Sequence, residues 1–147
     1  MKIFIRAADI NDTDLLFKWF NDKDTFKFKI KTKNRVTILE HKKWFSERLK
    51  DKNTFIWIIE NKKKESLGQI RFQHSTDNYY DVDIFVVDKA RKLGLASKAL
   101  IKVEKISNIK PLRAVVKKNN YLSYLFFTRN SYSLLSEDTE FWTLVKL

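Results

Sequence analysis

Hydrophobic and polar positions follow two different periods along the chain, and each period predicts one kind of element. Apolar residues that alternate with polar ones, or run together briefly, indicate strands, whereas apolar residues three or four positions apart indicate helices. Strands are predicted at residues 2–7, 54–60, 67–73, 79–87, 112–117, 132–135 and 141–147. Helices are predicted at residues 12–20, 38–50, 94–107 and 120–129, and the polar, basic stretch 21–35 is expected to be a loop. This order of elements predicts a domain of the α/β (α+β) class.

The composition fits one globular domain spanning residues 1–147. Apolar residues make up 44% and aromatic residues 14% of the chain, which is enough for a sizeable core. Cysteine is absent, which excludes disulfides, thiolate nucleophiles and zinc–thiolate sites. The two histidines, His41 and His74, lie far apart in sequence, so no metal is expected. No apolar run approaches the roughly 18 residues of a membrane span, and the N-terminus lacks the apolar block of a signal peptide, so we expect a cytoplasmic protein.

The charge is strongly positive, with 30 basic and 18 acidic residues and a net charge of +12. Such a surface favours anionic ligands, whether nucleic acid, acidic membranes or phosphorylated small molecules. The basic residues are spread along the chain and are densest at residues 62–64 and 23–35. Lys, Asn and Ile are abundant while Gly and Pro number two and one, so compositional drift explains the charge equally well.

The most informative segment is residues 83–97, where a strand runs through a short basic loop into a helix that opens with Gly94-x-Ala96. The first N–H groups of a helix have no partner within it, and with the helix dipole they form an anion site. Glycine lets a phosphate approach the backbone closely. The alternative for this segment is a simple tight turn before a helix.

Two motifs in this region resemble those of the GNAT N-acetyltransferases. Arg91-x-x-Gly94-x-Ala96 resembles the family's pyrophosphate-binding pattern, and Val116 followed by Asn120-x-x-Ser123 resembles its second signature. The resemblance implies a GNAT fold, with a mixed, mostly antiparallel sheet of about seven strands splayed between the fourth and fifth, and about four helices. It implies acetyl-CoA as the cosubstrate, bound by Phe85, Val86, Val87, Arg91, Lys92, Leu93, Gly94, Leu95, Ala96, Ser97, Asn120, Ser123 and Phe127. The resemblance also implies a homodimer as one form of the protein, although no feature of the sequence requires it.

The sequence departs from the family pattern in the helix after Asn120. In this family the helix usually ends in Gly-Phe, but here Ser131-Tyr132 stands in that place. A Tyr is often found four residues after the Ser, but here that position is Phe127. In the family that Tyr commonly protonates the departing thiolate. Tyr124, one turn earlier, is the candidate replacement, and its alternative role is packing.

The N-terminal half resembles a narrower group of bacterial GNAT enzymes, those of the pseudaminic-acid pathway type that acetylate nucleotide-linked amino sugars. The motif is Trp19-Phe20-Asn21-Asp22, a basic loop, and then residues 40–45 containing His41 and Trp44-Phe45. The resemblance implies that the acceptor amine is the 4-amino group of a UDP-linked amino-dideoxy sugar in surface-glycan biosynthesis. The acceptor-binding residues it implies are Asn21, Lys27, Arg35, His41 and Trp44. Alternatively, the two tryptophans pack in the core between helices, and His41 is simply an exposed residue of its helix.

The implied reaction is acyl transfer to a neutral amine. A backbone N–H on residues 83–87 would stabilise the carbonyl oxygen, and acetyl-CoA would pair with the strand edge left open by the splay from residues 112–117. Asp83 is the first candidate for the base, Asp81 on the same face is the second and His74 is the third. The two aspartates are equally compatible with a solvent-facing or salt-bridged pair.

Other functions remain open at this point. The acceptor could instead be a protein N-terminus or a small amine. A non-catalytic basic RNA-binding domain would also use the charge and the aromatic residues, although no RNP-type or Gly-x-x-Gly motif is present, and no nucleic-acid partner is expected. A GNAT fold that only binds ligands is the third alternative.

Overall fold

The computed structural model describes residues 1–22 and 36–147, apart from the side chain of Lys92. The strands are β1 (Ile3–Ala7), β2 (Thr54–Asn61), β3 (Ser66–His74), β4 (Tyr80–Val86), β5 (Leu112–Lys117), β6 (Ser133–Glu137) and β7 (Phe141–Lys146). The described helices are α1 (Thr13–Phe20), α3 (Ile38–Lys50), α4 (Leu95–Ser107) and α5 (Tyr121–Arg129), with the 3-10 helices η1 (Ile10–Asp12) and η2 (Asp88–Leu93). The predicted strands and helices are confirmed with ends shifted by one or two residues. The expectation of a plain loop before α4 was wrong, because those residues form η2.

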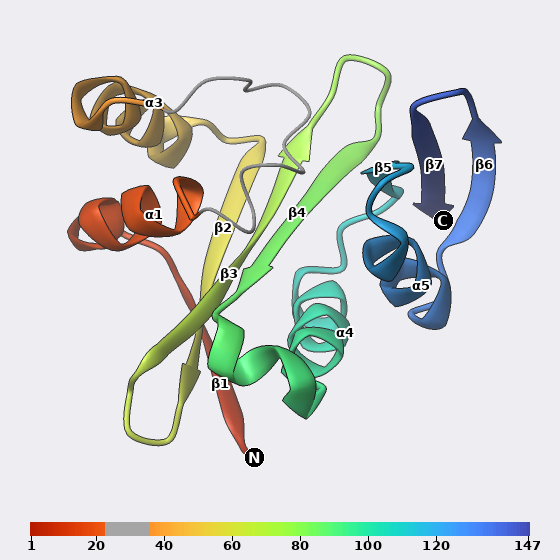
Figure 1. Cartoon of the computed structure of the whole chain (residues 1–147). Helices are drawn as coiled ribbons and strands as arrows, with labels where there is room; N and C mark the ends of the chain where they lie inside the picture. The colour runs from red at the N-terminus through yellow and green to blue at the C-terminus, as the bar shows by residue number, and fades with distance from the viewer. Residues whose placement is uncertain (23–35) are drawn as a thin grey trace.

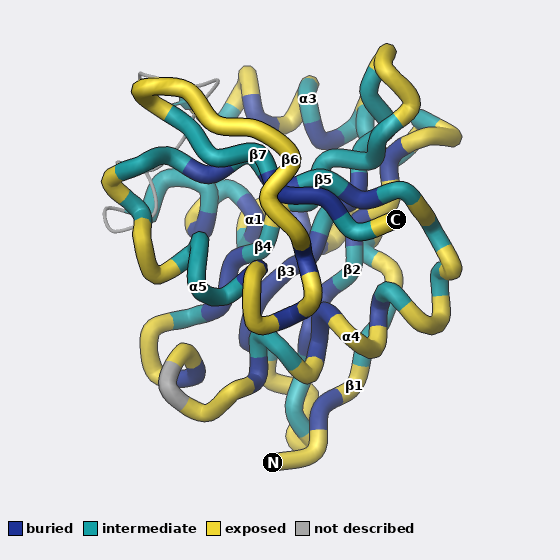
Figure 2. Tube along the Cα trace, turned by 90° about the vertical axis from the view of Figure 1, so that its right-hand side faces the viewer, coloured by how far each residue is buried: buried dark blue, intermediate teal, exposed yellow. Residues whose placement is uncertain are grey.

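The seven strands form one sheet in the order β1-β2-β3-β4-β5-β7-β6. β4 and β5 run parallel, and the other neighbouring strands are antiparallel. α1 and α3 cover one face of the sheet, whereas α4 and α5 lie on the opposite face (Figure 1). The edge strand β6 is exposed along its whole length (Figure 2).

A separate hydrophobic core covers each face of the sheet. Phe45 of α3 is fully buried against Trp19 of α1 and Ile58 of β2. On the other face, the buried residues of α4 pack onto the central strands, with Phe72 of β3 at 0% exposure. Burial of these large side chains stabilises the fold by roughly 1.5–3 kcal/mol each. The two cores therefore hold the middle of the sheet rigidly between the helix layers.

β4 and β5 pair only at one end. The register joins Tyr80 to Leu112 and Asp81 to Arg113, and the Tyr80 N–H donates to the Pro111 carbonyl at 3.0 Å. No further β4–β5 pair occurs within the described strands, and the two strands diverge from that point (Figure 1). The predicted splay between the fourth and fifth strands is confirmed.

Candidate active site

The splay leaves backbone groups of β4 unpaired on the side facing β5. In an antiparallel pair, alternate residues direct both N–H and C=O to the same neighbour. The Val87 N–H bonds to the Leu67 carbonyl on the β3 side, while the Tyr80 N–H bonds on the β5 side. Val82, Ile84 and Val86 share the parity of Tyr80, so their N–H and C=O groups face β5. The Val82 N–H still belongs to the ladder formed by the Asp81–Arg113 pair, and the Val86 carbonyl accepts from Arg91, so the groups left open are the Val82 carbonyl, both groups of Ile84 and the Val86 N–H. A ligand with amide groups can pair with this edge as an additional strand.

The N-terminus of α4 lies next along the chain from this edge. Gly94 is its N-cap, with φ 70° and ψ 14°, and no side chain caps the helix. The first N–H to bond within the helix is that of Lys98, which donates to the Gly94 carbonyl at 3.3 Å, so the N–H groups of residues 95–97 precede the helical ladder. A Cβ placed on Gly94 would meet no atom within 4 Å, which leaves the backbone open to a ligand. By contrast, Thr37 caps α3 by accepting from the Glu40 N–H at 3.2 Å.

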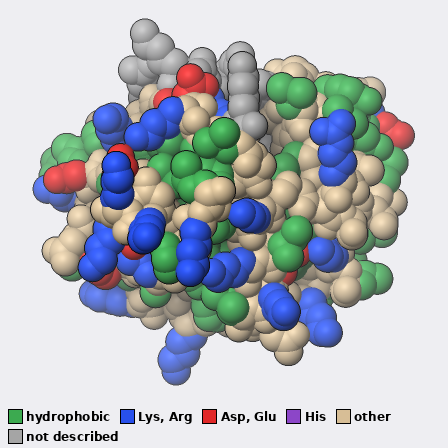
Figure 3. Space-filling model, turned by 90° about the horizontal axis from the view of Figure 1, so that it is seen from below, with side chains coloured by type: hydrophobic (Ala, Val, Ile, Leu, Met, Phe, Trp, Pro, Cys, Tyr) green, Lys and Arg blue, Asp and Glu red, His purple; other side chains and the backbone are tan. Residues whose placement is uncertain are grey.

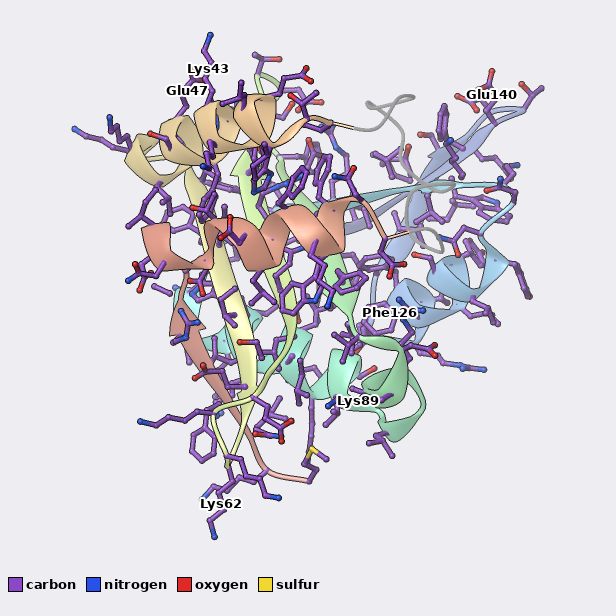
Figure 4. The ribbon with its side chains drawn as sticks, turned by 60° about the vertical axis from the view of Figure 1, so that its left-hand side comes forward. Lys43, Glu47, Lys62, Lys89, Phe126 and Glu140 are labelled. Carbon is purple, nitrogen blue, oxygen red and sulfur yellow. The ribbon has the colours of Figure 1, made fainter. Side chains whose placement is uncertain are left out.

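The surroundings of η2 are basic. Lys89 on η2 pairs with Glu65 at 3.4 Å, which places η2 beside the turn that carries Lys62 (Figure 4). Many Lys and Arg side chains cover the face of the molecule seen from below (Figure 3). This charge favours the arrival of an anionic cosubstrate at the start of α4.

Arg91 lies beside the predicted anion site but folds back toward β4. Its Nε donates to the Val86 carbonyl at 2.8 Å, and its guanidinium lies 5.5 Å from the centroid of the Phe85 ring. Its Nη1 also pairs with Asp88 at 3.4 Å. Arg91 thus fixes the turn between β4 and η2. Leu93, the predicted neighbour on the same turn, is 57% exposed.

The residues predicted from the second motif meet at the start of α5. The Asn120 Oδ1 caps the helix by accepting from the Ser123 N–H at 3.3 Å. The Tyr124 ring is half-buried, 4.5 Å from the Trp142 ring, and no described residue hydrogen-bonds its hydroxyl. Phe127 is only 4% exposed and packs edge-on against Tyr132. Phe127 thus belongs to the core, and its contact with the cosubstrate stays a prediction.

Asp83 lies on the face of β4 that α1 and α3 cover, and it is exposed. Its Oδ2 accepts from the Gln69 Nε2 at 2.8 Å. Arg71 of β3 lies directly opposite Asp83 in the register, and its guanidinium is 5.0 Å from the Trp44 ring centroid. Sequence reasoning missed Arg71 and Gln69. Their parity with Asp83 becomes visible only once the β3–β4 register is known.

The two other candidate bases are engaged or lie elsewhere. The Asp81 carboxylate accepts from the Arg113 Nε at 2.7 Å and Nη2 at 3.1 Å, so the salt-bridged alternative holds for this residue. The hydrogen bond with Asp81 raises the pKa of Arg113 above its ordinary value. His74 packs edge-on against Tyr80 at 4.9 Å between centroids, on the opposite face of the sheet from Asp83. Of the two candidate carboxylates, Asp83 is thus the one that is exposed and not engaged in an ion pair.

His41 is buried, so the alternative of an exposed position was wrong, while its acceptor-binding role stays a prediction. It is 1% exposed, its Nε2 lies 3.0 Å from the Thr13 carbonyl, and its ring stacks on Phe45. The ring therefore joins α3 to α1, and Trp44 rests 6.0 Å from it. The Asn21 Nδ2 donates to the Val36 carbonyl at 3.3 Å. Lys27 and Arg35 lie outside the described residues.

Comparison with known proteins identifies this arrangement. The sequence matches the acetyltransferase (GNAT) domain family over residues 2–130. The chain belongs to the GNAT family. The open β4 edge and the uncapped start of α4 are accordingly parts of an acetyl-CoA-dependent N-acetyltransferase.

Individual relatives agree with the family. The GNAT chain is 24% identical over 139 residues to acetyltransferase PseH of Campylobacter jejuni, covering 92% of this chain and 87% of that protein. A domain from Methanocaldococcus jannaschii superposes with a TM-score of 0.82 at 21% identity, covering 99% of this chain and 97% of the other. Spermidine N-acetyltransferase from Vibrio cholerae, in complex with CoA and spermine, also gives a TM-score of 0.82, at 12% identity and with coverage of 99% and 95%. The solved structures show that the GNAT fold is shared.

Two further findings concern this GNAT chain. Within residues 1–22 and 36–147, no helix is long and apolar enough to cross a membrane. The same residues contain no group of His, Asp or Glu side chains suited to holding a metal ion.

Proposed function

We propose that the protein acetylates the 4-amino group of a UDP-linked amino-dideoxy sugar, as part of bacterial surface-glycan biosynthesis. The observation that carries this proposal is the N-terminal motif, Trp19 to Asp22 followed by His41 and Trp44, together with the similarity to PseH along 92% of the chain. Trp44 lies against Arg71, the cross-strand partner of Asp83, on the face where an acceptor can approach β4. An aromatic face and a guanidinium suit a ligand with flat rings and phosphates.

The described residues fit acetyl-CoA in two places. The free N–H groups of residues 95–97, with open space at Gly94, suit its pyrophosphate. The outward N–H and C=O groups of Ile84, with the Val82 carbonyl, suit the amides of its pantetheine arm. Asn120 and Ser123 support this side by fixing the start of α5.

Acetyl-CoA supplies an acetyl group on a thioester, which a neutral amine can attack. In this scheme the N–H groups of Ile84 and Val86 donate to the oxygen on which negative charge develops. The Asp83 carboxylate, held by Gln69, takes the proton that the amine must lose. The Tyr124 hydroxyl returns a proton to the departing sulfur. Holding both reactants against one strand supplies much of the rate by alignment.

Small amines and polyamines are the competing acceptor class. The fold shared with the spermidine N-acetyltransferase of Vibrio cholerae makes that class reasonable. A net charge of +12 works against it, because a positive field repels polycations and attracts nucleotide sugars.

The test is a thiol-release assay with acetyl-CoA and a panel of acceptors: UDP-linked 4-amino sugars, spermidine, simple amines and peptides. The proposal expects kcat/KM for a UDP-amino sugar to exceed that for every other class by at least about tenfold. Mass spectrometry of the product should show one acetyl group on the sugar. Turnover of peptides or spermidine without turnover of any UDP-amino sugar would discard the proposal.

A further inference from the structure

Arg71 is a half-buried arginine whose charge no carboxylate balances within the described part of the chain. Arg6, Arg91 and Arg113 each form an ion pair with at least one aspartate or glutamate. The Arg71 guanidinium lies over the face of Trp44, 5.0 Å from the ring centroid. A guanidinium on an aromatic face keeps its N–H donors available in its own plane.

The absence of an ion pair between Arg71 and Asp83 is informative because the two are cross-strand partners. In a hydrogen-bonded antiparallel pair, opposite side chains stand on one face of the sheet, with Cα atoms about 5.5 Å apart. Asp83 is nevertheless held by Gln69 at 2.8 Å, and Arg71 is held by Trp44. A cation and an anion therefore stand on neighbouring strands without forming a direct ion pair.

Trp44 is itself fixed, so Arg71 is preorganised. The Trp44 ring lies 6.0 Å from both His41 and Phe20, and His41 is anchored to the Thr13 carbonyl. The sequence-predicted motif residues thus act through one another: His41 positions Trp44, and Trp44 positions Arg71. A preorganised donor loses less conformational entropy when it binds an oxyanion.

We infer that Arg71 binds a phosphate of the acceptor while Asp83 faces the acceptor's amine. This inference rests on the proposed function and deepens it, because it assigns the oxyanion of the acceptor to Arg71 and the amine to Asp83. The pair accounts for selectivity, because Arg71 attracts a nucleotide sugar and repels a polyamine at the same site. A carboxylate on an acidic amine shares this oxyanion chemistry and is distinguished in the test.

The test compares Arg71→Gln with the wild-type enzyme on four acceptors: a UDP-linked amino sugar, the same amino sugar without phosphate, a carboxylated amine and spermidine. For the UDP-linked sugar we expect KM to rise about 10- to 100-fold, the usual effect of losing a charge-assisted hydrogen bond. KM for the phosphate-free sugar and for acetyl-CoA should change by less than about twofold, within the ordinary effect of a neutral substitution. Arg71→Lys should recover part of the loss, since it keeps the charge but not the planar fork.

Lys43→Gln is the matched control. Lys43 points away from the sheet on the outer face of α3 (Figure 4), so its loss changes the net charge without touching the acceptor face. Calorimetry with UDP in the presence of CoA adds a readout independent of turnover. Binding should weaken about tenfold or more in Arg71→Gln and stay unchanged in Lys43→Gln.

The outcomes separate the two claims. If a carboxylated amine, but no UDP-amino sugar, is turned over in an Arg71-dependent way, the proposed function fails and the oxyanion role of Arg71 stands with carboxylate as its source. If the UDP-amino sugar is turned over equally well by Arg71→Gln, the inference is overturned and the proposed function stands. The inference is also overturned if Arg71→Gln raises KM equally for phosphate-bearing and phosphate-free acceptors. It is overturned as well if Arg71→Gln binds UDP as tightly as the wild type does.

Discussion

Asp81 on β4 and Arg113 on β5 form a bidentate ion pair at the end of the sheet where these two parallel strands still pair. The nitrogen–oxygen distances are 2.7 and 3.1 Å, and Arg113 also contacts Asp77 in the turn before β4. Beside them the Tyr80 N–H bonds to the Pro111 carbonyl. The strands separate from Val82 onward, so this pair lies at the vertex of the splay and fixes where it begins.

Asp81→Asn should lower stability more than it lowers chemistry. Removing one partner leaves a largely buried Arg113 with weaker bonds, which should cost about 1–2 kcal/mol. For a chain of this size that lowers Tm by a few degrees, measurable by thermal or urea unfolding. Glu47→Gln, on the exposed outer face of α3 (Figure 4), is the control for charge. If Asp81→Asn were as stable as Glu47→Gln, or if it lost as much kcat as Asp83→Asn, the structural role of Asp81 at the splay would be contradicted.

Asp83→Asn should lower kcat without unfolding the protein. A positioned base contributes about 10²- to 10⁴-fold, and the exposed Asp83 is bonded only to Gln69 among the described residues. The deficit should shrink as pH rises, because a larger share of the acceptor amine is then already neutral. The measurement is kcat against pH for the variant and the wild type. A deficit that is constant across the pH range would show that Asp83 does not take the proton.

Much of the fold was readable from the sequence because its information is local. Periodicity located the helices and strands, and the Gly94 motif marked the start of α4, where the left-handed backbone conformation favours glycine. Gly68 had no such signal. A Cβ there would lie 2.2 Å from the Phe85 carbonyl oxygen, a close approach that depends on how β3 meets β4.

The candidate site was less predictable because side-chain roles depend on contacts between distant segments. Asp81 and Asp83 share one face of one strand, yet a partner from β5 engages only Asp81. His41 stands in a helix rich in charged residues, and only the approach of α1 buries it. Arg71 belongs to no motif, and its importance follows from the β3–β4 register and from Trp44.

Gly94→Glu should abolish acetyl-CoA binding. The new carboxylate would stand at the uncapped start of α4 and compete with the pyrophosphate for the same N–H groups. Because φ is 70°, part of any effect is backbone strain of about 1–2 kcal/mol. Gly94→Asn is the matched control, since Asn tolerates this conformation and carries no charge. Calorimetry with acetyl-CoA should show binding in Gly94→Asn and none in Gly94→Glu. If Gly94→Glu still bound acetyl-CoA, the pyrophosphate would have to bind elsewhere than at this loop.

Tyr132 should make stability depend on pH in the alkaline range. Its hydroxyl donates to the Glu104 Oε2 at 2.6 Å, and Lys146 bonds to the other oxygen of that carboxylate at 2.8 Å. Burial raises the pKa of Tyr132 above its ordinary value near 10, and the bond to Glu104 raises it further. The folded state therefore holds this proton more tightly than the unfolded state, so the stabilisation is complete below pH 10 and is lost as pH rises beyond it.

Tyr132→Phe isolates this contribution, because it keeps the ring against Phe127 and removes only the hydroxyl. At neutral pH the variant should be less stable by about 1–3 kcal/mol, the cost of leaving a buried acceptor short of one hydrogen bond. Urea unfolding of both proteins at a series of pH values from neutrality to above 10 measures the difference in unfolding free energy, and lysine titration common to both cancels in it. We expect the difference to narrow steadily above pH 10, since only the wild type gains from ionising Tyr132 on unfolding. A difference that stays constant to the highest pH would mean that the Tyr132 proton is held no more tightly in the folded protein than in the unfolded chain.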